Sequence, residues 1–234
     1  MIAAAIVVAT ICSYAAGWAL GRPALVPVLN TLAAFPFMVA ALRAGRLRLA
    51  VVRMLLWALT MAVCATALAY LRPWETGQLF VRGAEYRTEM FGWVMTGRGT
   101  ESTPSAFIPQ HAGHAALFTA LALATGGVLA MPMGAALMNY MGTYVGSLSA
   151  AGARPAMTML LAWHPWAVIR IVSFVVLGVV LSAPLWSRLL RFKVEWQDAR
   201  RLAAYAGAGL IVDVVLKALL APAWQRLLLR TVGW

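Results

Sequence analysis

The chain has 234 residues, of which 63% are hydrophobic and only 11% are charged, and its mean hydropathy is +0.82. One soluble core cannot hide so much apolar surface, so these values exclude an ordinary water-soluble globular protein. The formal net charge of +12 would suit a nucleic-acid partner, but the chain has no aromatic–basic motif of that kind and its arginines cluster at the ends of apolar segments, so no nucleic-acid partner is expected.

Apolar stretches long enough to cross a bilayer recur along the whole chain. A helix needs about 20 residues to cross about 30 Å of hydrocarbon. The first stretch lacks a basic start and is as long as a true span, so we interpret it as a helix and not as a signal peptide. The sequence predicts an all-α polytopic membrane protein with about seven (six to seven) transmembrane helices in a single bundle over residues 1–234. The expected spans are 2–21, 24–42, 49–71, 112–131, 133–151, 166–186 and 202–221.

The span at 133–151 is the least apolar of the seven, so a re-entrant or short buried helix is an alternative there. Its small residues Gly142, Gly146 and Ala150 are spaced four apart, a pattern that lets neighbouring helices approach closely. Such small-residue faces are candidate contact surfaces for membrane-protein partners.

Basic residues in two short loops set the expected orientation. Basic loops tend to stay in the cytoplasm, and seven spans place both loops on that side. We therefore expect a multi-pass protein of the inner (plasma) membrane, with its amino terminus in the cytoplasm, its carboxyl terminus outside and membrane lipids as its first partners. The basic residues are Arg43, Arg46, Arg48 and Arg53 in one group, and Arg188, Arg191, Lys193, Arg200 and Arg201 in the other.

Residues 72–110 form the one sizeable soluble segment, on the outer face. In QLFVRGAEYRTEMFGWV, Met90 and Trp93 fall on one helical stripe, and Arg82 and Glu85 fall on another. This pattern predicts one amphipathic helix that lies in the membrane interface. The following TGRGTESTPSAFIPQ is rich in Gly, Ser, Thr and Pro and predicts a turn-rich loop that leads into the fourth span.

All three histidines of the chain are expected at the outer face. His111 and His114 open the fourth span three residues apart, and imidazoles at this spacing project from one side of a helix. His164 precedes the sixth span, and Glu101 lies in the turn-rich loop near the first two histidines. Such groups can act together as acid and base. The candidate catalytic residues are His111, His114, His164 and Glu101.

The same histidine pair supports the hypothesis of a metal site. Two imidazoles and a loop carboxylate can hold zinc or a similar divalent ion and leave one position for water. HxxH is short and lacks the additional glutamate of HExxH, and plain interface histidines are the alternative. A b-type haem between His114 and His164 is a further alternative, although no haem signal flanks them. The candidate metal ligands are His111, His114, Glu85 and Glu89.

The segment PQHAGHAAL resembles the PSGHA segment of the phosphatidic-acid-phosphatase-type membrane phosphatases. The resemblance implies that His114 donates a proton to the leaving group, and that His164, which follows Arg154, is the nucleophile. This sequence departs from the family in the spacing, because ten positions separate Arg154 from His164. Val168 also stands where the family has an aspartate.

Charged residues inside the last two spans need an explanation, because charges are costly in lipid and normally pair or face water. One interpretation is a bridge between Asp213 and Lys217, four residues apart, with Arg170 reaching outward to the interface. In the other, Arg170 and Lys217 line a pocket for a phosphate or carboxylate. The candidate substrate-binding residues are Arg154, Arg170 and Lys217.

The convergence of polar residues on one face favours a hydrolase that acts on a lipid, lipid-linked or membrane-peptide substrate at the outer leaflet. No complete catalytic signature accompanies it. One alternative is a non-catalytic membrane subunit of a larger complex. Another is a transporter or permease-like protein in which Asn139 and the intramembrane charges form a polar path.

Overall fold

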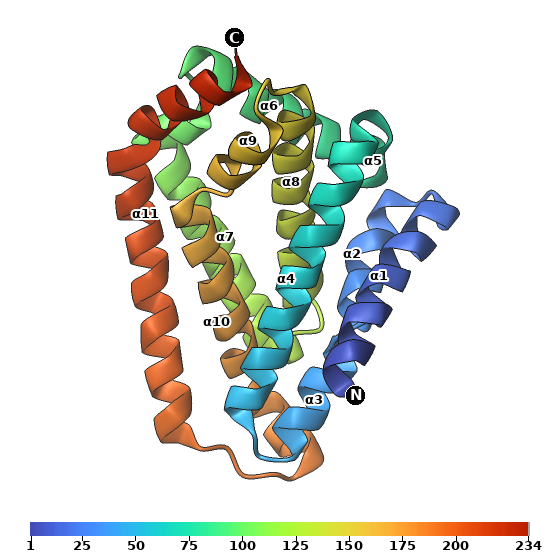
Figure 1. The fold of residues 1–234 in the computed structure, drawn as a ribbon. Coiled ribbons are helices and arrows are strands. Elements are labelled where there is room, and N and C mark those ends of the chain that lie inside the picture. Colours follow the sequence, from blue (N-terminus) through green and yellow to red (C-terminus); the bar gives the residue numbers. More distant parts are fainter. Residues whose placement is uncertain (234) are drawn as a thin grey trace.

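The computed structural model describes residues 1–233 and confirms the predicted fold class, because 87% of the residues are helical and the described part contains no strand. Long helical passages run side by side between two ends of the molecule (Figure 1). They are formed by α1 (Ile2–Leu20), α2 (Val26–Leu32) with α3 (Phe35–Arg43), α4 (Leu47–Leu71), α7 (Pro104–Thr125), α8 (Ala130–Ala151), α10 (Pro165–Leu190) and α11 (Trp196–Val232).

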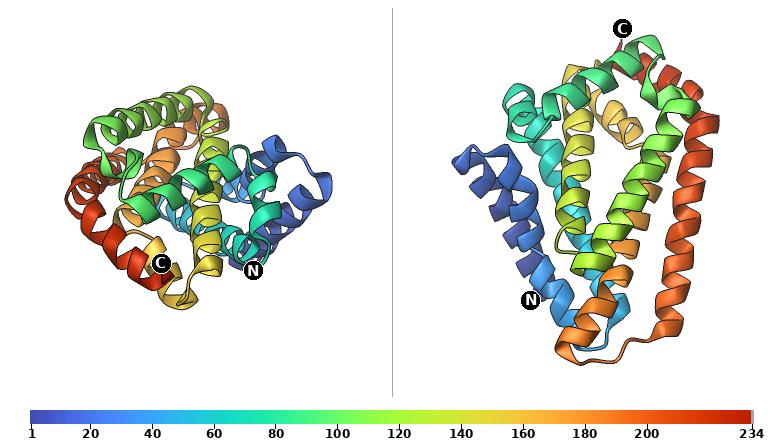
Figure 2. Two further views of the ribbon diagram at one scale, coloured as in Figure 1. Left: turned by 90° about the horizontal axis from the view of Figure 1, so that it is seen from above. Right: turned by 180° about the vertical axis from the view of Figure 1, so that it is seen from behind.

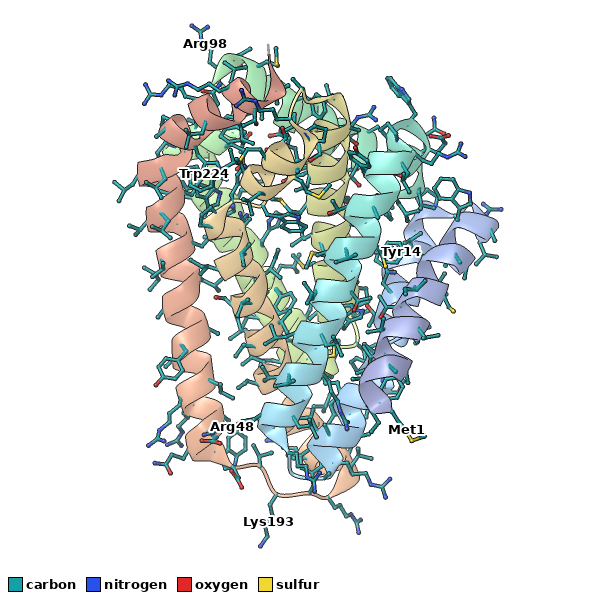
Figure 3. The ribbon with its side chains drawn as sticks, in the orientation of Figure 1. Met1, Tyr14, Arg48, Arg98, Lys193 and Trp224 are labelled. Carbon is teal, nitrogen blue, oxygen red and sulfur yellow. The ribbon has the colours of Figure 1, made fainter. Side chains whose placement is uncertain are left out.

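Short helices close one end of the bundle, which we call the α6 end. There α5 (Pro73–Leu79), α6 (Gly83–Thr96) and the 3-10 turn η2 (Thr100–Ser102) lead from α4 to α7, and α9 (Pro155–Ala162) joins α8 to α10 (Figure 2). A further 3-10 turn, η1 (Pro23–Leu25), precedes α2. We call the opposite end, which carries the α3–α4 and α10–α11 loops, the basic end. Arg48 and Lys193 lie there and Arg98 lies at the α6 end (Figure 3).

Five of the passages are long and apolar enough to cross a membrane, namely α1, residues Pro23–Arg43, α4, α10 and α11. The other two, α7 and α8, have 22 residues each and are therefore about 33 Å long. α8 is one continuous helix and not a re-entrant turn. It carries polar residues because every residue from 141 to 149 is buried against other helices and none of these side chains meets lipid.

The boundaries of α7 differ from the predicted span 112–131. Pro104 occupies the first position of the helix, which suits a residue without a backbone N–H, and Gly126 ends it in a left-handed conformation with φ 59°. The turn-rich segment consequently ends at Thr103. His111 and His114 lie two to three turns inside the helix instead of opening it.

A helix, α6, lies within the segment where the amphipathic helix was predicted, but it begins only at Gly83, because residues 80–82 separate it from α5. It lies across the end of the bundle (Figure 2), with Met90 and Trp93 buried and with Arg82 and Glu85 exposed. α11 extends to Val232, beyond the predicted 202–221. Pro222 lies inside α11, and the last turns of the helix bend across the α6 end (Figure 1).

The small-residue stripe of α8 packs within the chain. Gly142 lies against Ala65 of α4, and Gly146 lies against Thr66 and Ala69 of the same helix. The face is therefore covered by α4 at Gly142 and Gly146, whereas Ala150 is exposed.

A buried polar network joins α1, α2 and α8. The Tyr14 hydroxyl donates to Asn139 Oδ1 at 2.5 Å, and Asn139 Nδ2 donates to Asn30 Oδ1 at 3.0 Å. Asn30 Nδ2 in turn donates to Ser13 Oγ at 2.8 Å. Asn139 therefore has its hydrogen bonds inside the bundle. The transporter hypothesis requires Asn139 to line a polar path, and it does not.

We expect Asn139→Leu to lower the free energy of unfolding by about 2 kcal/mol, because Asn30 Oδ1 would lose its donor and the Tyr14 hydroxyl would keep only the Met61 carbonyl, at 3.3 Å, as an acceptor. Thermal unfolding of the purified protein in detergent would measure the loss. Gln78→Leu is the matched control, because Gln78 is exposed on α5. Equal unfolding temperatures for the two variants would contradict the stabilising role of the network.

Candidate functional site

A cavity of about 380 Å³ lies between α4, α7, α8, α10 and α11, a size within the usual range for small-molecule sites. Most of its wall is apolar, with Phe118, Met131, Met138 and Phe174 deep between the helices. The polar lining residues come from α6, η2, the parts of α7, α10 and α11 nearest the α6 end, and α8, where the Tyr140 ring stacks on Tyr86 with ring centres 5.6 Å apart. They are Tyr86, Glu101, Gln110, His111, His114, Tyr140, Arg170 and Asp213.

Three of these residues, from α7, α10 and α11, form one connected group. Arg170 Nη1 lies 2.7 Å from His111 Nε2, and Arg170 Nε lies 3.4 Å from Asp213 Oδ2. A guanidinium has only donors, so it donates to His111 Nε2, and His111 is neutral with its hydrogen on Nδ1. The group therefore keeps the Asp213 carboxylate next to a cation inside the bundle.

Two buried atoms of this group have no hydrogen-bond partner within residues 1–233. They are His111 Nδ1 and Asp213 Oδ1. His111 Nδ1 lies 3.7 Å from Asp213 Oδ2, which is too long for a hydrogen bond. The Asp213 side chain is only 2% exposed, and buried acceptors without a donor are rare. Asp213 Oδ1 can therefore accept a hydrogen bond from a hydroxyl, an ammonium or a water in the cavity.

Lys217 forms the second ion pair of the site. Its Nζ donates to Glu101 Oε1 at 2.7 Å and lies 4.6 Å from the centre of the Phe107 ring. The partner is Glu101 and not Asp213, which was the alternative in the sequence. Because each cation has its own carboxylate and His111 is neutral, these ion pairs leave no net charge at the site. An anion would have to compete with Asp213 and Glu101 for Arg170 and Lys217.

His114 lines the cavity beside His111 and is not part of the Arg170 group. It lies one turn beyond His111, and no hydrogen bond to a side chain or carbonyl within the described residues engages it. Tyr86 faces the same space from α6. Burial raises the pKa of the Tyr86 phenol, so this side chain stays a neutral hydroxyl.

His164 lies outside the cavity, in an aromatic core. Its side chain stacks on Trp166 with ring centres 4.7 Å apart, and its Nε2 lies 3.3 Å from the Tyr144 hydroxyl. Burial, helped by the charges of Arg170 and Lys217, lowers the pKa of His164 to about 3, so the imidazole is neutral at physiological pH.

The structure does not bring His164 and His114 to a common space. The residue pair on which both the haem hypothesis and the phosphatase resemblance depend is therefore not assembled. Arg154 is exposed at the start of α9 and does not line the cavity either.

The proposed metal ligands are not assembled. Glu85 and Glu89 lie on the exposed face of α6, and Glu85 pairs with Arg82 at 2.7 Å. Within residues 1–233, no group of three or more His, Cys, Asp or Glu side chains could hold a metal ion. His111 and His114 with these two glutamates do not fit a zinc site.

Asp213 belongs to the site but was not among the candidate site residues predicted from the sequence. The signal for it was its position in an apolar span, because an ionisable residue at membrane depth is a functional candidate by default. Gln110, Tyr86 and Tyr140 also line the cavity and were not among the candidate site residues either.

The chain matches no family model, no curated protein and no solved structure. Its function therefore has to be inferred from the chemistry of the site.

Proposed function

We propose that the protein is a membrane-embedded hydrolase that acts on an amphiphilic substrate, either a lipid, a lipid-linked molecule or a membrane peptide. The observation that carries the proposal is the division of the cavity wall into an apolar part and one polar end with His111, His114, Arg170 and Asp213. An amphiphile has the same division between its chain and its head group. Ionisable residues at membrane depth commonly mark substrate sites.

His114 is the proposed acid–base group, because its imidazole lines the cavity without a protein partner. In hydrolysis, a base takes a proton from the attacking water while the water oxygen bonds to the carbonyl carbon or phosphorus. An acid then protonates the leaving group as its bond breaks, and one imidazole can serve in both steps. Asp213 Oδ1 is the proposed acceptor for the attacking water or a substrate donor, while Arg170 and His111 position Asp213.

Glu101 has a positioning role in this proposal. Its Oε1 accepts a hydrogen bond from Lys217 Nζ at 2.7 Å. The pair ties η2 to α11 and thereby fixes the segment that leads into α7.

We expect His114→Asn to lower the turnover number by about 100-fold or more, because general acid–base groups contribute roughly 10²–10⁴ to the rate. The measurement is product formation by mass spectrometry, with protein reconstituted in vesicles that contain defined ester and phosphoester lipids. Thr119→Ala, on the same helix but outside the cavity lining, is the control and should keep wild-type turnover. Unchanged turnover in His114→Asn would overturn its role. No product from any lipid with the wild type would favour the subunit or transporter alternatives.

We also propose that the basic end lies in the cytoplasm, so that the polar end of the cavity faces the outer leaflet of the inner membrane. The support is the charge at the two ends. The loops and adjoining helix ends at the basic end carry the two arginine-rich groups with only Glu195 and Asp198 as acids. At the α6 end, the four arginines of the segment 72–110 are balanced by four glutamates, and Arg154, Arg226 and Arg230 add to them. A reporter that works only outside the cytoplasm, fused after the last residue, should be active. An inactive fusion would contradict the proposed orientation and place the α6 end in the cytoplasm.

A further inference from the structure

The route by which a molecule reaches the cavity follows from how α7 and α11 are arranged. Both helices line the cavity, yet they contact each other at only a few positions. Seen from behind, they stand on either side of α10 (Figure 2). Near the α6 end, α11 is joined to η2, the turn just before α7, by the ion pair between Lys217 and Glu101.

Some residues of α7 and α11 belong both to the cavity wall and to the outer surface of the bundle. Ile108 on α7 is 43% exposed, and Ile211 and Val215 on α11 are 67% and 48% exposed, although all three line the cavity. The cavity is therefore continuous with the lateral surface of the bundle. These three side chains are apolar, so this part of the surface suits contact with lipid.

The route from the α6 end is closed by contrast. Lys217 is completely buried beneath Glu101, and Phe107 beside it is 1% exposed. Trp93 Nε1 donates to Ser102 Oγ at 2.6 Å and Gln225 Nε2 donates to the Val94 carbonyl at 2.5 Å, which joins α6 to η2 and to α11. A water-soluble substrate would have to open these contacts.

The polar end of the cavity favours a particular head group. Its two ion pairs cancel, and the buried Asp213 Oδ1 accepts no hydrogen bond from residues 1–233. A head group with a hydroxyl or ammonium group can donate the missing hydrogen bond to this oxygen. A bare phosphate brings only acceptors when ionised and would be repelled by the same carboxylate.

Deeper in the cavity, the wall suits a flexible chain. Phe118, Met131 and Met138 are apolar, and methionine side chains adapt to irregular apolar partners. We infer, on the basis of the proposed function, that the substrate is a membrane-resident amphiphile that enters from the lipid between α7 and α11. Its apolar chain lies against these three residues and its hydroxyl- or ammonium-bearing head group binds at Asp213 and His114.

Photo-crosslinking tests this inference without requiring turnover. The probe is phosphatidylethanolamine with a diazirine in its acyl chain, incorporated into nanodiscs with the protein, and crosslinked peptides are mapped by mass spectrometry. We expect labels on Phe118, Met131 or Met138. Labels confined to lipid-facing positions such as Val8 and Ile11 of α1 would overturn the inference.

A pair of variants on neighbouring residues sharpens the test. Ala115 lines the cavity and Ala116 does not, although both lie on α7. Ala115→Trp should reduce labelling of the three chain-binding residues at least 10-fold, and Ala116→Trp should leave it unchanged. Equal labelling in both variants would overturn binding of the acyl chain in the cavity. If Ala115→Trp fails to fold, Ala112→Trp makes the same test, because Ala112 lines the cavity at an exposed position.

The head group is tested with phosphatidic acid that carries the same diazirine chain. It should label the chain-binding residues at least threefold less than phosphatidylethanolamine, and equal or stronger labelling would overturn the preference for a donor. These labels report binding alone. Labelled residues without any hydrolysis product would contradict the proposed hydrolase and still support the binding site. Product without labelled residues would contradict only the inferred binding site.

Discussion

Replacing Lys217 with methionine is expected to lower the free energy of unfolding by about 3–5 kcal/mol, the usual loss when one member of a buried ion pair is removed. The Lys217 side chain is 0% exposed and its Nζ lies 2.7 Å from Glu101 Oε1. The variant leaves the Glu101 carboxylate, 14% exposed, without its cation. Titration of the purified protein with a denaturing detergent would measure the loss.

Two further variants separate the ion pair from other effects. Glu101→Gln with Lys217→Met removes both charges and should recover most of the loss, because no unpaired charge stays buried. Arg82→Met is the exposed control. Arg82 pairs with Glu85 at 2.7 Å, but the two side chains are 74% and 68% exposed, so solvent screens the pair and stability should not change measurably. A double variant as unstable as Lys217→Met would contradict the ion-pair explanation.

The helical passages could be predicted from the sequence because the signal is local. A run of about 20 apolar residues is readable without knowing its neighbours. α8 was the exception, since its polar residues made 133–151 look marginal. Burial by other helices removes the need for an apolar surface, and this depends on packing that one segment does not reveal. Gly142 and Gly146 were the local indication that α8 has close helical neighbours.

The part of the site that depends on local spacing could be predicted in the same way, but the pairing between distant residues could not. His111 and His114 share a helix face through their spacing, and both line the cavity. Lys217 pairs with Glu101, 116 residues away, instead of Asp213 on its own helix. That choice depends on where η2 packs against α11, and no periodicity of the sequence encodes it.

His164 shows the limit of inference from residue type. A histidine at the start of an outer-face span fitted an acid–base role, and the phosphatase resemblance supported the same residue. The sequence WHPW around it contained the contrary signal, because Trp166 is one of the rings that bury the imidazole. Aromatic neighbours exclude water and keep His164 neutral, which suits packing better than proton transfer.

The substitution Gly146→Ala is expected to lower the free energy of unfolding by about 3 kcal/mol, at the upper end for overpacked positions. A Cβ at Gly146 would overlap the Thr66 carbonyl oxygen and would lie 2.8 Å from the backbone nitrogen of Tyr70. Both atoms belong to the backbone of α4, which cannot move aside as a flexible side chain could. The variant can therefore be accommodated only if α4 and α8 separate, and thermal unfolding in detergent would measure the cost.

Gly207→Ala provides the matched control for this result. Gly207 lies within α11, and a Cβ there would meet no atom within 4 Å. Alanine is the better helix former by roughly 0.5–1 kcal/mol, so this variant should be slightly more stable than the wild type. Opposite signs for the two identical substitutions would attribute the loss to contact with α4 and not to helix propensity. A stabilised Gly146→Ala variant would contradict the close approach of α4 and α8.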